Sequence, residues 1–196
     1  KSMAAGLFGE INTRIDVLML GLFLSDSDVG IYSFAAFVLD GLFHLLAMLR
    51  VNFNPYLVGA LRDKKQDDLD ALLRKTRVRV PMAMAVLSIL AIAAFYILCT
   101  QILPGRNLLE GMPSLVILLT GMVVVSGFVP YDNLMLASGR PGYQTLQQMT
   151  AVLANVIGNL LFIPLFHIEG AALGTACGFI LGTLMLIFMS RRMLGW

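Results

Sequence analysis

The chain contains several apolar runs that are each long enough to cross a lipid bilayer as a helix. About 20 apolar residues in a helix match the roughly 30 Å hydrocarbon core of a membrane. Hydrophobic residues make up 58% of the 196 residues and charged residues only 13%, whereas a soluble domain carries about 25% charged residues. These features predict an all-α polytopic membrane protein, built as a bundle of transmembrane helices in the lipid bilayer.

Six runs are predicted to span the membrane, separated by breaks that are rich in turn-forming residues. They cover residues 4–24, 30–52, 80–103, 113–137, 143–166 and 170–189. The second run is expected to continue as helix past Pro55 to about residue 60. The third is expected to begin near Pro81, because proline favours the first turn of a helix. The chain is thus predicted to form one six-helix transmembrane lobe.

The basic residues are distributed unevenly along the chain. Most lie in a connector at residues 61–79, whose leucines also predict a short amphipathic surface helix. Short cytoplasmic loops collect Lys and Arg. If Lys1 is cytoplasmic and the number of spans is six, eleven basic residues fall inside and only Arg106 falls outside. Both termini are therefore predicted to be cytoplasmic.

The first run carries ionisable residues, which are costly inside a bilayer and mark functional sites by default. Arg14 and Asp16 lie near its centre, and Glu10 shares a helix face with Arg14. Asp16 points about 160° away from Arg14 on a helix, so it needs another partner or a water-filled cavity. We interpret these residues as part of a substrate or ion pathway, with Arg14 as an anion contact. The alternative is a structural ion pair between helices.

The second run places four polar residues within an arc of about 120° of one helix. They are Asp40, His44, Arg50 and Asn54. Such an arc on an apolar helix is typical of a face turned to a polar cavity. Asp40 and His44 are four residues apart, a spacing that allows a proton-carrying carboxylate–imidazole pair. Arg50 has the alternative of extending its charge to the membrane interface.

Pro130 interrupts the fourth run just before Asp132 and Asn133. A proline inside a helix frees a carbonyl group and kinks the chain, and such breaks in transporters often face the pathway. Asp132 and Asn133 are therefore further candidates for the cavity. An interfacial position for Asp132 is the competing interpretation.

The last two runs carry a stripe of amides and a stripe of glycines. The amides lie within about 60° of one another on a helix; they are Gln144, Gln148, Asn155 and Asn159. Asn155 and Asn159 are cavity candidates, because amides suit sugar hydroxyls, but hydrogen bonds between helices in lipid are an equally common use. The glycines recur every four residues and predict close helix packing; they are Gly170, Gly174, Gly178 and Gly182.

Several function classes have no support in the sequence. No phosphate-binding loop, zinc-ligand spacing or nucleophile motif is present, so neither an enzyme nor a bound metal or cofactor is expected. Cys99 and Cys177 both lie in apolar runs, where small packing residues are the usual interpretation. The formal net charge of +2 indicates no nucleic-acid partner.

Three segments of the sequence resemble a known family. They are RIDVLMLGLFLSDSDVGIYSFAA at residues 14–36, NPYLVGAL at 54–61, and LMLASGRPGYQTLQQMTAVLANVIGNLLFIPLFHIEGAALGTA at 134–176. Their order and spacing are similar to the C-terminal half of Wzx-like polysaccharide flippases. These flippases export O-antigen and exopolysaccharide units and belong to the multidrug/oligosaccharidyl-lipid/polysaccharide superfamily.

The resemblance implies a two-lobe, MATE-like transporter in the bacterial inner membrane, in which this chain supplies the C-terminal lobe. Its partners would be an N-terminal six-helix lobe and a lipid-diphosphate-linked oligosaccharide, moved by alternating access with possible coupling to an H⁺ or Na⁺ gradient. Arg14 would contact the diphosphate. Because the chain begins at Lys1 rather than Met, we expect it to be part of something longer.

Two other functions remain open from the sequence. One is a lobe of a cation-coupled multidrug exporter, which would have an acidic cavity with aromatic walls. The charges of the first two runs are mixed rather than acidic, which favours the flippase. The other is a membrane scaffold subunit that transports nothing, in which the polar residues serve only packing.

Overall fold

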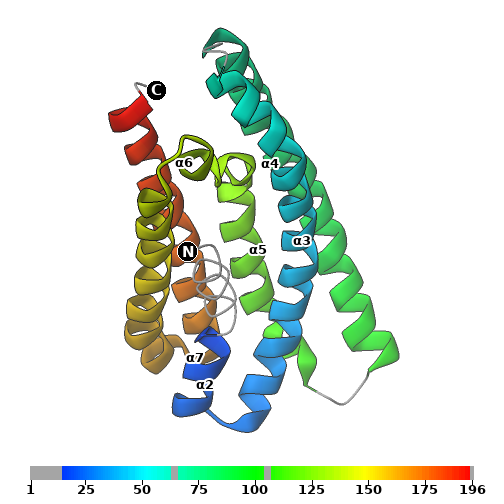
Figure 1. Ribbon diagram of the computed structural model, residues 1–196. Coiled ribbons are helices and arrows are strands. Elements are labelled where there is room, and N and C mark those ends of the chain that lie inside the picture. The colour runs from blue at the N-terminus through cyan, green and yellow to red at the C-terminus, as the bar shows by residue number, and fades with distance from the viewer. Residues whose placement is uncertain (1–14, 63–65, 104–106, 195–196) are drawn as a thin grey trace.

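The computed structural model describes residues 15–62, 66–103 and 107–194, and within these ranges it contains helices and turns but no β-strand (Figure 1). The all-α prediction is confirmed for this part of the chain. Glu10 and Arg14 lie outside the described residues. Of the first predicted span, the structure describes only the end, as helix α2 (Ile15–Phe23).

A capping arrangement separates α2 from α3 (Asp26–Arg62). The Ser25 hydroxyl and backbone N–H both donate to Asp28 Oδ2, at 2.7 and 3.2 Å, and the Asp28 N–H donates to Ser25 Oγ at 3.4 Å. This reciprocal pattern satisfies N–H groups that a helix start leaves unpaired. Helix α3 then continues past Pro55, as the sequence predicted.

Helix α4 (Gln66–Ile97) corrects the prediction for the connector and the third span. The expected short surface helix within residues 61–79 is instead the first part of one helix that runs on through the span, so Pro81 lies inside the helix and not at its start. Because Pro81 has no backbone N–H, the helical hydrogen bond to the carbonyl of Arg77 is missing. Gly127 packs beside this site, because a Cβ there would lie 3.1 Å from both the Arg77 Cα and the Pro81 ring.

The end of α4 leads through a π-helix (Leu98–Ile102) and a 3₁₀ turn (Leu108–Gly111) into α5 (Met112–Ser126). The predicted fourth span, 113–137, is therefore too long. After Ser126 the chain forms a 3₁₀ turn, η3 (Val129–Tyr131), and one short helix, α6 (Leu134–Ala137). Pro130 lies in η3 and has no N–H with which to continue the helix, so the interruption falls where the sequence predicted it.

Helix α7 (Pro141–Leu194) covers both of the last two predicted spans. It contains a reversal at His167, whose φ of 53° and ψ of −123° are not helical. Gly158 packs against Gly174, and Gly182 packs against Ala151. The earlier residue of the first segment, Ala151, contacts the later residue of the second, Gly182. The segments on either side of His167 are therefore antiparallel, as Figure 1 shows.

The connections between helices gather at the two ends of the bundle (Figure 1). The end of α3, the start of α4, α6 and the C-terminal end of α7 lie at one end. The α2–α3 junction and the reversal of α7 lie at the other. The buried core between them joins α2, α3, α5 and α7 through fully buried side chains such as Leu20, Ala35, Leu118 and Ala172.

The surface of the bundle is apolar in a way that suits lipid. Large side chains such as Leu22 and Phe37 are 81% and 73% exposed, and monomeric soluble proteins rarely expose large apolar patches. Among the described residues, four helical ranges are long and apolar enough to cross a membrane: Asp26–Gly59, Arg74–Ile102, Leu108–Ser126 and Pro141–Arg192. The chain thus has the features of a membrane-embedded helical protein.

Candidate functional site

A cavity of about 200 Å³ lies inside the bundle, between α2, α3, the end of α5 and both segments of α7. Its ionisable lining residues in the described part of the chain are Asp16, Asp40, Asp132 and Arg50. Amides and hydroxyls add to this lining through Gln147, Gln148, Thr175 and Thr183. Four of the sequence-predicted candidates therefore meet around one cavity, although they come from three separate regions of the sequence.

Asp16 is buried at 3% exposure and accepts hydrogen bonds from two other helices. The Tyr32 hydroxyl donates to its Oδ2 at 2.5 Å, and the Thr175 hydroxyl donates to the same oxygen at 3.2 Å. The backbone N–H of Val17 donates to Oδ1 at 2.8 Å. A buried carboxylate is tolerated when it is hydrogen-bonded in this way. The partner that the sequence required for Asp16 is thus supplied by Tyr32 and Thr175.

The amide stripe of α7 extends this network away from the cavity. Asn155 Nδ2 donates to the Thr175 hydroxyl at 3.3 Å, and Asn159 Nδ2 donates to Asn155 Oδ1 at 2.7 Å. Both asparagines are buried, at 2% and 0% exposure. Neither is among the residues that line the cavity. Asn159, Asn155 and Thr175 thus form a chain of hydrogen bonds that crosses between the two segments of α7 and ends at Asp16. In this structure the two asparagines make hydrogen bonds between helices and do not line the cavity.

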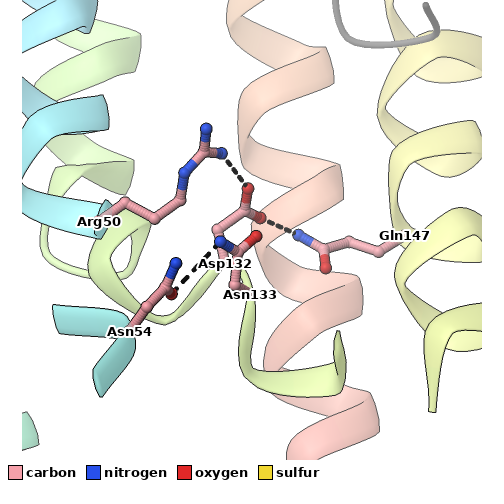
Figure 2. Close-up of polar contacts among 5 residues, drawn as sticks. All are labelled: Arg50, Asn54, Asp132, Asn133 and Gln147. Carbon is pink, nitrogen blue, oxygen red and sulfur yellow. Dashed lines mark hydrogen bonds and ion pairs between the residues drawn. The ribbon is translucent and has the colours of Figure 1, made fainter. Parts of the chain in front are cut away.

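A second polar cluster lies at the interruption after α5, and Figure 2 shows its members pointing toward one another. Arg50 of α3 donates to Asp132 Oδ2 at 3.0 Å and forms an ion pair with it. Gln147 of α7 donates to the other oxygen, Oδ1, at 2.5 Å. Asn133 donates to Asn54 Oδ1 at 3.3 Å. The residues that follow Pro130 therefore link α3 to α7.

His44 does not join this site. Its side chain is exposed, and its ring Nδ1 lies 2.7 Å from the backbone carbonyl oxygen of Asp40. Asp40 itself lines the cavity, whereas His44 does not. The arc predicted for α3 is thus divided: Asp40 and Arg50 face the cavity, and His44 lies outside it.

The glycines predicted to pack helices lie along the second segment of α7. A Cβ on Gly174 would lie 2.8 Å from the backbone nitrogen of Asn159, and one on Gly178 would lie 2.9 Å from the carbonyl oxygen of Ala151. Gly182 and Gly170 also meet the first segment closely, at the Ala151 side chain and at the Phe162 carbonyl, and the approach at Gly170 is the closer of the two. Gly178 and Gly182 also line the cavity. Their missing side chains keep the two segments close and leave the cavity open on this side.

Aromatic side chains form part of the cavity wall. Phe43 of α3 and Phe179 of α7 both line it, and their rings stack with centroids 5.6 Å apart. The ionisable lining in the described part of the chain comprises three aspartates and one arginine. Because Arg50 is paired with Asp132, the rest of this lining is acidic or neutral. Among the same residues, no three His, Cys, Asp or Glu side chains come together as a metal site would require.

Sequence reasoning missed Tyr32, Thr175 and Gln147. Tyr32 and Thr175 stand in apolar segments with no local pattern that separates them from packing residues. Gln147 lies next to Gln148 of the predicted stripe, but about 100° around the helix from it. Only the fold brings these side chains to Asp16 and Asp132.

Comparison with family models, curated proteins and solved structures finds no match for this chain.

Proposed function

We propose that this chain is the C-terminal lobe of a polysaccharide flippase, which moves lipid-diphosphate-linked oligosaccharides across the bacterial inner membrane by alternating access. The observation that carries the proposal is a cavity lined partly by charged, amide and hydroxyl groups, inside an apolar, membrane-type helical bundle. Its amide and hydroxyl groups both donate and accept hydrogen bonds, as sugar hydroxyls do. The resemblance of residues 14–36 and 134–176 to Wzx-like flippases adds the substrate class.

The proposed lobe has six spans with both termini in the cytoplasm. The spans would be the run that ends with α2, then α3, α4 and α5, and the two antiparallel segments of α7. Three parts of the described chain that carry basic residues lie at the same end of the bundle: the end of α3 at Arg62, the turn after α6 that holds Arg140, and the end of α7 with Arg191. This agrees with the positive-inside rule if that end is cytoplasmic.

Asp16 is the proposed link to an ion gradient. A buried carboxylate that touches a cavity and is held by groups from two other helices is sensitive to the arrangement of those helices. Intramembrane carboxylates commonly serve ion or proton pathways. On this proposal, binding of H⁺ or Na⁺ at Asp16 would favour one arrangement of the lobe over another.

A reconstitution assay tests the function. The transporter that contains this chain is placed in liposomes with a fluorescent polyprenyl-diphosphate-linked oligosaccharide, and a membrane-impermeant quencher is added outside. The flippase proposal predicts that quenching proceeds beyond the outer leaflet, while vesicles without protein stop at about half of the signal. Quenching that stops at the same level in both preparations contradicts the proposal.

A cation-coupled multidrug exporter is the second candidate, and two observations favour it. The described cavity lining carries three aspartates and one arginine, and the stacked pair Phe43–Phe179 supplies an aromatic wall. This candidate predicts that cells expressing the transporter extrude ethidium, and that Asp40→Asn abolishes the extrusion. The flippase proposal predicts no extrusion beyond that of cells carrying an empty vector.

A further inference from the structure

Three neighbouring residues of the cavity lining each keep a polar atom that has no hydrogen-bond partner among the residues that the structure describes. The atoms are Arg50 Nε, Gln147 Oε1 and Gln148 Oε1. They are buried, and Gln147 as a residue is only 5% exposed. Buried polar groups in native proteins are nearly always paired. Three unpaired groups at one cavity therefore indicate that something else satisfies them when the protein works.

The charge of this cluster is already balanced. Asp132 accepts from Arg50 with one carboxylate oxygen and from Gln147 with the other (Figure 2). What the cluster still offers is one N–H donor on Arg50 and two amide oxygens on the glutamines. The orientation of the Gln147 amide is fixed because its NH₂ group donates to Asp132, so its oxygen stays an acceptor.

We infer that Arg50, Gln147 and Gln148 form a subsite for the hydroxyl groups of a neutral sugar, separate from any site for the diphosphate. The inference rests on the proposed function and assigns one part of the substrate to one part of the cavity. A hydroxyl donates and accepts, so hydroxyls on one sugar match an N–H and two amide oxygens. A diphosphate only accepts hydrogen bonds, and it would face two amide oxygens and the Asp132 carboxylate.

The three unpaired atoms are buried, so the side chains must turn to bring them to a sugar in the cavity. Gln148 already lines the cavity, and no other part of the described chain holds its amide oxygen. The terminal torsion of a glutamine amide has a broad distribution, so this oxygen turns toward a ligand easily. Arg50 uses a terminal nitrogen for Asp132, which leaves its Nε–H as the donor that this ion pair does not use. The ion pair therefore orients the donor without being broken.

Two probes separate the sugar from the diphosphate. The complete transporter in lipid nanodiscs is titrated with undecaprenyl diphosphate, and then with undecaprenyl diphosphate that carries one N-acetylglucosamine. We expect the wild type to bind the sugar-bearing probe more tightly. Gln148→Leu should weaken binding of that probe about fivefold, the effect of one neutral hydrogen bond, and leave binding of the bare diphosphate unchanged.

Two further variants sharpen the test. Arg50→Lys keeps a cation beside Asp132 but removes Nε, so it should also weaken only the sugar-bearing probe. Gln144→Leu is the matched control: Gln144 lies one helical turn before Gln148 and also has a buried, unpaired oxygen, but it does not line the cavity. It should change the affinity for neither probe. Thermal unfolding of each variant verifies that it is folded.

The outcomes distinguish this inference from the proposed function. If the wild type binds both probes equally, or if Gln148→Leu weakens both equally, the sugar subsite is wrong while the flippase proposal stands. If the wild type binds neither probe, the proposed function fails and the inference fails with it. A loss confined to the sugar-bearing probe in Gln148→Leu and Arg50→Lys, and absent in Gln144→Leu, supports the subsite.

Discussion

Thr175 donates a 3.2 Å hydrogen bond to Asp16 across 159 positions of the sequence. This contact ties α2 to the second segment of α7, at the point where Asn155 of the first segment also donates to Thr175. One hydroxyl thus connects three helical segments around a buried carboxylate. The candidate site is therefore part of the packing of the bundle and is not an addition to its surface.

Thr175→Val keeps the shape of the side chain but removes both of these hydrogen bonds. We expect the variant to lower the free energy of unfolding by about 1–2 kcal/mol, because it removes two buried hydrogen bonds and leaves the amide of Asn155 without its acceptor. Denaturant titration in detergent micelles, followed by circular dichroism, measures the loss. Thr183→Val is the control, since Thr183 lines the same cavity but its hydroxyl makes no hydrogen bond with the described residues. Equal stability of the two variants would refute the role of Thr175.

The ion pair between Arg50 and Asp132 should contribute a measurable coupling energy. A double-mutant cycle with Arg50→Gln and Asp132→Asn isolates it. Because both side chains are partly exposed, at 32% and 26%, we expect a coupling of only about 1 kcal/mol. A cycle on Asn54 and Asn133, the neutral pair beside it, should give a smaller value. No coupling between Arg50 and Asp132 would contradict the geometry of the cluster.

Gly174→Ala tests the close contact between the two segments of α7. A Cβ at this position would lie 2.8 Å from the backbone nitrogen of Asn159, and backbone cannot move aside cheaply. Overpacking of this kind costs about 1–3 kcal/mol, so the thermal midpoint in detergent should fall. Gly142→Ala on the same helix has no atom within 4 Å of its new Cβ, and its midpoint should stay the same or rise. A drop of similar size in both variants would argue against this packing.

His167 occupies a backbone conformation that favours glycine. Its φ of 53° and ψ of −123° are costly for residues with a Cβ, by about 1–3 kcal/mol. His167→Gly should therefore stabilise the reversal by about 0.5–1 kcal/mol, after allowing for the greater flexibility of unfolded glycine. Leu165→Gly, at an exposed position two residues before it, should instead destabilise the protein by about 1 kcal/mol. Chemical denaturation of the two variants should therefore shift in opposite directions, and a destabilised His167→Gly would count against the reversal.

Much of the fold could be predicted from local patterns in the sequence. The apolar runs predict the helices, and Pro130 predicts the interruption after α5. Helix α3 itself begins at Asp26, before the predicted start of the second run at residue 30. The predictions failed where a local signal had two meanings. Pro81 is compatible with a helix start, but it is also tolerated inside α4, where Gly127 packs beside it. The six-span count remains a prediction.

The candidate site could be predicted only in part. Asp16, Asp40, Arg50 and Asp132 stand out because charge is rare and costly in apolar runs. Tyr32 and Thr175 could not be found, because they are common in membrane helices and become polar partners only when the fold brings them to Asp16. Asn155 and Asn159 were correctly grouped on one helix face, but the sequence alone could not decide between a cavity and a hydrogen-bond network.

The most direct test of the account is the transport rate of Asp16→Asn in the liposome assay. Asparagine keeps an oxygen that accepts hydrogen bonds from Tyr32 and Thr175, but its NH₂ group replaces the oxygen that accepts from the Val17 N–H. Thermal unfolding of the variant therefore verifies that it is folded before its transport is compared. Asp26→Asn, an exposed residue outside the cavity lining, is the control and should transport at the wild-type rate. If Asp16 carries the proposed coupling, Asp16→Asn loses nearly all transport of the fluorescent lipid-linked oligosaccharide. Transport by Asp16→Asn at the rate of Asp26→Asn would contradict the central claim.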